Sequence, residues 1–136
     1  MKTIVIFYSY TGNTKKLAQE IAAKESADIT EIRDVRRPGN FKAYTMGCFA
    51  AMRSKTWLME PIAVNLQEYD RLIIMAPVWA GHLPPVINAL LEQLPAGKIV
   101  SCVAVSGSGH SSCKAQMEAF AKIKNCTLDK FEDIKA

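Results

Sequence analysis

A hydroxyl-rich loop near the start of the chain has the residue types that bind a phosphate. It consists of Ser9, Tyr10, Thr11, Gly12, Asn13 and Thr14. The loop follows the apolar run 4–8 and precedes a helical pattern over residues 15–22. The free N–H groups and the positive dipole end at the start of a helix attract anions. Since the loop contains no lysine, it differs from the phosphate loop of nucleoside triphosphatases. The same residues are also ordinary turn formers, so a plain turn is the alternative.

A second loop carries a tryptophan directly after another apolar run. It consists of Pro77, Val78, Trp79, Ala80 and Gly81. We expect Trp79 at the rim of the protein, because its small neighbours offer it little to pack against. An indole in that place could stack on a flat ligand, which is commonly worth ~0.5–1.5 kcal/mol beyond area burial. The alternative is that Trp79 packs against another loop.

A third loop is rich in glycine and serine and follows the apolar run 99–105. It consists of Ser106, Gly107, Ser108, Gly109 and His110. Glycines let the backbone approach a ligand closely and offer N–H donors to ring carbonyls and nitrogens. Alternatively, the segment is only a connector in which Ser111 or Ser112 caps the next helix.

The elements between these loops alternate between strand and helix patterns. Nearly continuous apolar runs at 4–8, 72–76 and 99–105 are typical of strands buried on both faces of a parallel sheet. The more polar segment 27–35 fits an edge strand. Amphipathic helices are predicted around 17–22, 86–94 and 117–121, with a crossover helix within 38–61. This alternation predicts a doubly wound α/β sheet in a single domain spanning residues 1–136.

In doubly wound sheets, ligands bind at the carboxyl ends of the strands, where the strand order reverses. The three loops should meet there. Together they offer a phosphate clamp, a stacking aromatic and a polar edge for a planar heterocycle, and flavin mononucleotide (FMN) has these three parts.

The same loops resemble those of the short-chain flavodoxin family. The resemblance rests on the Ser-Tyr-Thr-Gly-Asn-Thr loop 9–14, on Glu68-Tyr69-Asp70, on loop 77–81 and on Leu83-Pro84-Pro85, and it runs from Lys2 to about Lys124. It implies a flavodoxin-like fold, with a parallel five-stranded sheet of order 2-1-3-4-5 and noncovalently bound FMN. It further implies that residues 9–14 hold the phosphate, that Trp79 stacks on the isoalloxazine with Gly81 beside it, and that residues 106–110 meet its pyrimidine edge.

Three departures from the family pattern bear on function. The net charge is +4, whereas electron-transfer flavodoxins are usually acidic. The third loop has no Tyr or Trp, which leaves His110 as its only ring and one flavin face open to a quinone or nicotinamide. His110 is either a solvated side chain or a proton donor. After Lys124 the sequence predicts a weak fifth strand and no final helix, so either a second subunit or the C-terminal segment should cover that face, and we favour a homodimer.

Composition and cysteine usage exclude other classes of protein. The longest apolar runs are far shorter than the ~20 residues needed to cross a membrane, and the N-terminus does not resemble a signal peptide, so we expect a cytoplasmic protein. The four cysteines are widely spaced, and His110-x-x-Cys113 has no second pair with which to hold a metal. The basic residues are scattered rather than interleaved with aromatics, which argues against nucleic-acid binding.

Three functions therefore compete. The first is an FMN-binding redox protein that carries electrons between protein partners. The second is an NAD(P)H-dependent, FMN-containing quinone reductase on the same fold, with a small quinone-like acceptor. The third is a binding module that has lost the flavin, which the complete first loop and Trp79 disfavour.

Overall fold

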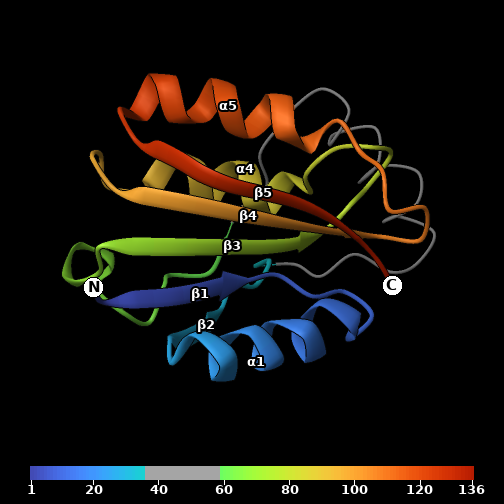
Figure 1. The fold of residues 1–136 in the computed structure, drawn as a ribbon, viewed down its shortest axis with the longest axis horizontal. Coiled ribbons are helices and arrows are strands. Elements are labelled where there is room, and N and C mark those ends of the chain that lie inside the picture. The colour runs from blue at the N-terminus through green and yellow to red at the C-terminus, as the bar shows by residue number, and fades with distance from the viewer. Residues whose placement is uncertain (36–58) are drawn as a thin grey trace.

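The computed structural model describes residues 1–35 and 59–136. Strands and helices alternate along the chain, as Figure 1 shows. The elements are β1 (Thr3–Phe7), α1 (Asn13–Glu25), β2 (Asp28–Glu31), the short 3₁₀ helix η2 (Leu66–Glu68), β3 (Arg71–Pro77), α4 (Pro85–Gln93), β4 (Ile99–Ser106), α5 (Cys113–Lys124) and β5 (Thr127–Lys135). No helix in the described ranges is long and apolar enough to span a membrane.

All five strands form one parallel sheet in the order β2-β1-β3-β4-β5, which confirms the predicted topology. The central strands carry the continuous apolar runs, and Ile4, Leu72 and Val100 lie next to one another across them. All three of these side chains are fully buried. The reason is that helices cover both faces of these strands, as their sequence pattern predicted.

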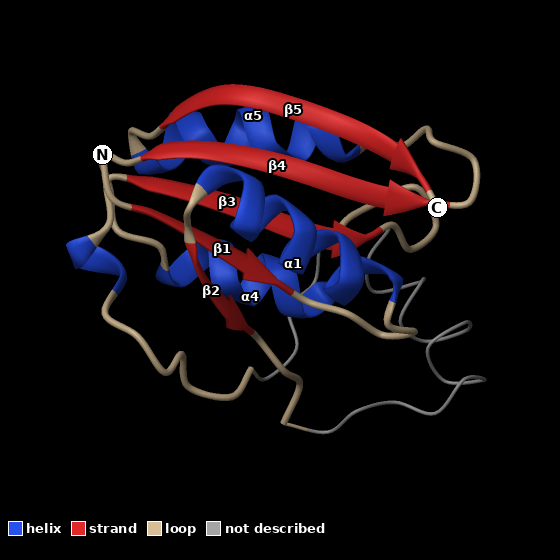
Figure 2. Ribbon diagram, turned by 60° about the horizontal axis from the view of Figure 1, so that its bottom comes forward, coloured by secondary structure: helices blue, strands red, loops and turns tan. Residues whose placement is uncertain are grey.

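Helix α1 lies on one face of the sheet, and α4 and α5 lie on the other (Figure 2). On the first face, Ala18 and Ala22 of α1 pack against Val5, Met75 and Val103. On the second face the core is larger. Its fully buried members include Ile6, Ile74, Leu83, Ile87, Leu90 and Met117.

Two elements differ from the sequence-based expectations. Strand β2 ends at Glu31 rather than near residue 35. One further backbone bond runs from the Ile32 N–H to the Phe7 carbonyl, and the chain then leaves the sheet edge, with Asp34 forming an isolated bridge to Met59. Strand β5 is nine residues long and is a full member of the sheet. The predicted crossover helix within 38–61 lies almost entirely outside the described residues.

On the face of the sheet that carries α1, polar side chains of β3, β4 and β5 occupy the part for which the sequence predicted no covering helix. The pairing register of β4 and β5 shifts between Val100 and Ser101. There the buried Ser101 hydroxyl donates to Asp129 (2.5 Å) and accepts from the Arg71 guanidinium (3.0 Å). Lys130 and Glu132 form an ion pair at 2.6 Å beside them. These polar groups tolerate water, and self-association over this face stays a prediction.

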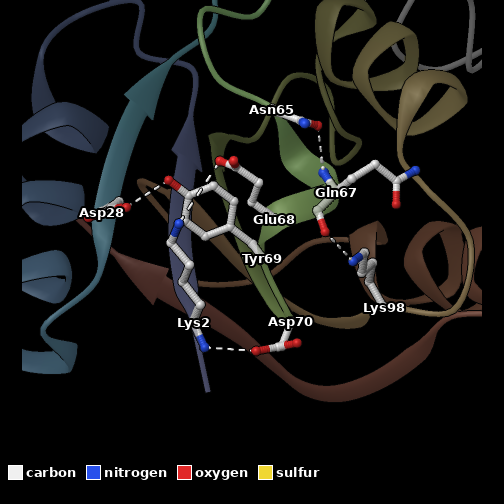
Figure 3. Close-up of polar contacts among 8 residues, drawn as sticks. All are labelled: Lys2, Asp28, Asn65, Gln67, Glu68, Tyr69, Asp70 and Lys98. Atoms are coloured by element: carbon white, nitrogen blue, oxygen red, sulfur yellow. Dashed lines mark hydrogen bonds and ion pairs between the residues drawn. The ribbon is translucent and has the colours of Figure 1, made fainter.

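A polar cluster fixes the amino ends of the strands, at the edge opposite the three loops (Figure 3). The Tyr69 hydroxyl donates to the Asp28 carboxylate at 2.7 Å, which joins the start of β3 to the edge strand β2. The Lys2 N–H donates to Asp70 at 2.9 Å, and the Lys2 ammonium lies 4.8 Å from the centre of the Tyr69 ring. Strand β1 is therefore tied to the segment that leads into β3.

The Tyr69 phenol gives this cluster a measurable pH dependence. Its hydrogen bond to the Asp28 carboxylate, together with burial, raises the pKa of Tyr69 to about 12. In the unfolded chain the phenol ionises near pH 10. The folded form therefore loses stability as the pH rises from about 10 to about 12, because the unfolded state releases the proton first. We expect the free energy of unfolding to fall less steeply over this range in Tyr69→Phe, measured by urea unfolding. Equal slopes for both proteins would contradict the assignment.

Candidate functional site

The three loops singled out in the sequence lie together at the carboxyl edge of the sheet. They follow β1, β3 and β4, which are parallel neighbours, so their carboxyl ends reach the same edge (Figure 1). This is the edge at which open α/β sheets bind ligands. The structure thus brings all three predicted segments to one place.

In the first loop, the Ser9 hydroxyl organises the start of α1. Its oxygen accepts hydrogen bonds from the Gly12 N–H (3.1 Å) and the Lys15 N–H (3.2 Å). The helical ladder then begins with the bond from the Lys16 N–H to the Gly12 carbonyl at 3.1 Å. Gly12 has a φ of 102°, a value that side-chain-bearing residues rarely adopt, so the turn requires glycine.

Two N–H groups at the start of α1 remain for a ligand. Those of Asn13 and Thr14 have no acceptor among the residues that the structure describes, and the first turn of a helix supplies none. Thr11, Gly12 and Asn13 are exposed, whereas the Thr14 side chain is buried. These two amides and the helix dipole favour an anion at this turn. The Thr14 residue is only 2% exposed, and the phosphate site stays a prediction.

Trp79 is buried rather than left at the rim, which differs from the sequence-based expectation. Only 9% of the residue is exposed, and it belongs to the larger core cluster. Its ring meets the edges of Tyr8 and Tyr10, with ring centres 6.0 Å and 5.8 Å apart. Tyr8, directly before the first loop, and Tyr10 within it supply the packing that the small neighbours of Trp79 lack. Its role as a stacking surface stays a prediction.

Trp79 and His82 close a tight hairpin turn around Ala80 and Gly81. The Trp79 N–H donates to the His82 carbonyl (2.8 Å), and the His82 N–H donates to the Trp79 carbonyl (3.0 Å). Ala80 and Gly81 have φ values of 51° and 81°. Positive φ at both central residues is characteristic of a type I′ turn. The turn projects from the sheet edge, with Ala80 exposed at its tip.

The second loop is also fastened to the beginning of α5. The Ser112 N–H donates to the Gly81 carbonyl at 2.7 Å, and the Gln116 side chain accepts from the Leu83 N–H at 2.9 Å. Sequence reasoning missed His82 and Gln116 as parts of the site. His82 stood inside a segment already considered important, whereas nothing in the pattern around Gln116 distinguished it from other polar helix positions.

The third loop is held by its own serines and by β5. The Ser106 hydroxyl accepts from the Gly109 N–H (2.9 Å), and the Ser108 hydroxyl accepts from the His110 N–H (3.2 Å). A Cβ atom on Gly109 would lie 3.3 Å from that of Lys135, so glycine allows this close approach of β5. Gly107 and His110 are exposed. The loop therefore presents backbone and an imidazole to solvent, and no large aromatic ring.

A cavity of about 590 Å³ adjoins the first loop on the side of β2. At its wall, the Tyr8 hydroxyl donates to the Asp34 carboxylate at 2.5 Å, and Asp34 is only 8% exposed. Lys15 and Arg33 also line it. This volume is in the range of small-molecule sites. The sequence did not predict the cavity, because Asp34 lay in a segment interpreted as strand.

Thiol and metal chemistry are not built into the described part of the site. Cys113 lies at the start of α5, with its sulfur 3.8 Å from the Gly81 carbonyl oxygen. Burial raises the pKa of its thiol to about 11, so it is protonated at neutral pH and is a poor nucleophile. Across residues 1–35 and 59–136, no group of three or more His, Cys, Asp or Glu residues is arranged to hold a metal ion.

The fold and the three loops together define a flavodoxin-like α/β protein. A family model confirms this class. Residues 1–127 match the family described as NADPH-dependent FMN reductase, and the chain belongs to that family. The predicted resemblance to FMN proteins of flavodoxin-like fold is therefore confirmed, and the predicted cofactor, FMN, is the flavin that the family's description names.

Solved structures show the same fold at low sequence identity. A flavoprotein from Lactobacillus acidophilus in complex with FMN has a TM-score of 0.80 and 21% identity, over 96% of this chain and 91% of that one. The two-electron reduced flavodoxin of Megasphaera elsdenii has a TM-score of 0.62 and 15% identity, over 96% and 83% of the two chains.

A curated protein matches part of the sequence. An uncharacterized protein of Archaeoglobus fulgidus is 26% identical over 102 residues. The match covers 74% of this chain and 63% of that protein, so less than two thirds of the relative is represented here.

Proposed function

We propose that this protein is an FMN-dependent oxidoreductase that takes electrons from NADPH and passes them to a small acceptor such as a quinone. The family match over residues 1–127 supports this reaction class. The observation that carries the proposal is the pair of amide N–H groups of Asn13 and Thr14, which have no acceptor among the described residues. They lie at the edge where the loop of Trp79 also begins. If the phosphate of FMN were held there, its isoalloxazine ring would lie near the second and third loops.

The residues fit FMN as follows. The Asn13 and Thr14 amides and the α1 dipole would hold the phosphate, and Ser9 would keep the loop in shape for it. The second loop would border the ring, and the backbone N–H groups of residues 106–110 would meet its polar edge. FMN, when bound, supplies the hydride and electron chemistry. Because the third loop presents no large aromatic ring, one face of the flavin would stay accessible to NADPH and to the acceptor.

Two measurements on the intact chain test the proposal. FMN added to apo-protein should lose its fluorescence with a Kd below about 1 μM, which corresponds to about 8 kcal/mol. With NADPH and a soluble quinone, the FMN-loaded protein should then turn over at about 1–100 s⁻¹, a common range for enzymes. NADH serves as the control for nucleotide preference.

The outcomes separate the competing functions. Unchanged flavin fluorescence would exclude the flavoprotein and leave only its fold. Tight FMN binding without NADPH oxidation would favour the electron carrier between proteins, which was the first of the hypotheses from sequence.

A further inference from the structure

The Ala80–Gly81 turn has both of its carbonyl groups turned toward the protein. The Ala80 carbonyl oxygen lies 2.9 Å from Nδ1 of His82, and the Gly81 carbonyl accepts from the Ser112 N–H at 2.7 Å. The N–H groups of Ala80 and Gly81, in contrast, have no acceptor among residues 1–35 and 59–136. The exposed tip of the second loop is therefore a surface of hydrogen-bond donors.

The imidazole of His82 contacts the first of these carbonyl groups. A carbonyl oxygen only accepts hydrogen bonds, so this contact is a hydrogen bond when Nδ1 of His82 carries the hydrogen. The His82 side chain contacts the carbonyl of Ala80, two positions earlier. This contact ties the exposed tip of the turn to the residue that follows it. The Ser112 contact holds the next carbonyl from α5, 31 residues further along the chain.

Ala80 makes the opposite orientation of the turn unfavourable. Its φ of 51° lies in the left-handed region, which alanine rarely adopts. Rotating the Ala80–Gly81 peptide by half a turn would convert the type I′ turn into a type II′ turn. The first central residue of that turn is normally glycine, and a Cβ there is strained further. The His82 imidazole and the Cβ atom of Ala80 thus both keep the Ala80 and Gly81 N–H groups facing outward.

We propose that His82 is a positioning residue that presents the Ala80 and Gly81 N–H groups to an acceptor atom on the edge of a flat ligand. This inference rests on the proposed function, in which that ligand is the FMN ring. The oxidised ring has nitrogens that accept hydrogen bonds, and N5 becomes protonated on full reduction. A donor surface therefore binds the oxidised ring more tightly than the reduced ring, and lowers the midpoint potential of the bound flavin.

Two variants of His82 test the proposal. His82→Ala removes the hydrogen bond to the Ala80 carbonyl, whereas His82→Asn offers an amide N–H near the position of Nδ1. We expect the preference for the oxidised ring to fall about tenfold in His82→Ala, which raises the two-electron midpoint potential by about 30 mV. His82→Asn should keep the wild-type potential. The potentials are measured on FMN-loaded protein during stepwise reduction with a reference dye. Equal potentials in all three proteins would overturn the proposal.

A measurement on the wild-type apo-protein keeps the inference testable if a variant fails to fold. Nitrogen-15 NMR of histidine side chains distinguishes the two neutral tautomers. We expect the Nδ1–H tautomer for His82 at a pH where it is neutral, and the Nε2–H tautomer would overturn the inference. If the wild type binds no FMN, the proposed function fails, and the role of His82 toward a flavin fails with it. FMN binding with the Nε2–H tautomer would contradict only the role of His82.

Discussion

Trp79→Ala is expected to lower the free energy of unfolding by about 3–5 kcal/mol, the usual cost of truncating a buried aromatic residue to alanine. Trp79 is 9% exposed and packs against Tyr8 and Tyr10, so its removal leaves a cavity where two loops meet the core. The loss of edge-to-face contacts adds to the loss of buried area. This is the largest effect on stability that we expect from any residue in the three loops.

Urea unfolding of apo-protein, followed by circular dichroism, measures this effect. Ile123→Ala is the control, because Ile123 is 83% exposed and its truncation should change stability by less than about 0.5 kcal/mol. Trp79→Phe keeps an aromatic ring and should lose less stability than the alanine variant. A loss below about 1 kcal/mol in Trp79→Ala would show that the ring contributes little to the core. FMN binding of Trp79→Phe then tests the stacking role separately from stability.

The sheet could be predicted because the composition of its central strands allows only one structural role, that of buried strands. The runs 4–8, 72–76 and 99–105 are too short for helices that span the domain and too apolar for an exposed position. Burial on both faces requires helices on both sides, and the alternating pattern provides them. The carboxyl-edge loops then follow from topology alone, which is why the three predicted segments lie together.

The internal arrangement of the loops could not be predicted in the same way. Trp79 is buried by Tyr8 and Tyr10, which lie about 70 residues earlier, and the Leu83 N–H finds its acceptor in Gln116, 33 residues later. Such partners depend on side-chain directions at the ends of strands, which periodicity does not report. The positive φ of Ala80 could not be predicted either, because alanine rarely adopts this conformation and no neighbouring residue in the sequence requires it.

Gly12→Ala is expected to weaken FMN binding at least tenfold, which corresponds to about 1.4 kcal/mol. At its φ of 102°, any side chain strains the backbone, although no atom lies within 4 Å of the Cβ that alanine would add. The substitution therefore acts through conformation rather than through a clash. As the backbone relaxes toward negative φ, the Gly12 N–H turns away from Ser9, and the amides of Asn13 and Thr14 no longer point at one phosphate.

Gly97→Ala provides the matched control for this prediction. Gly97 has a φ of 78° and likewise open space at its Cβ, but it lies in the turn between α4 and β4, at the opposite edge of the sheet. Both variants should lose about 1–2 kcal/mol of stability through backbone strain, and only Gly12→Ala should lose affinity for FMN, measured by fluorescence titration. Wild-type affinity for FMN in both variants would show that the first loop does not hold the phosphate. A loss in both would show that affinity follows global stability rather than the geometry of the α1 N-terminus.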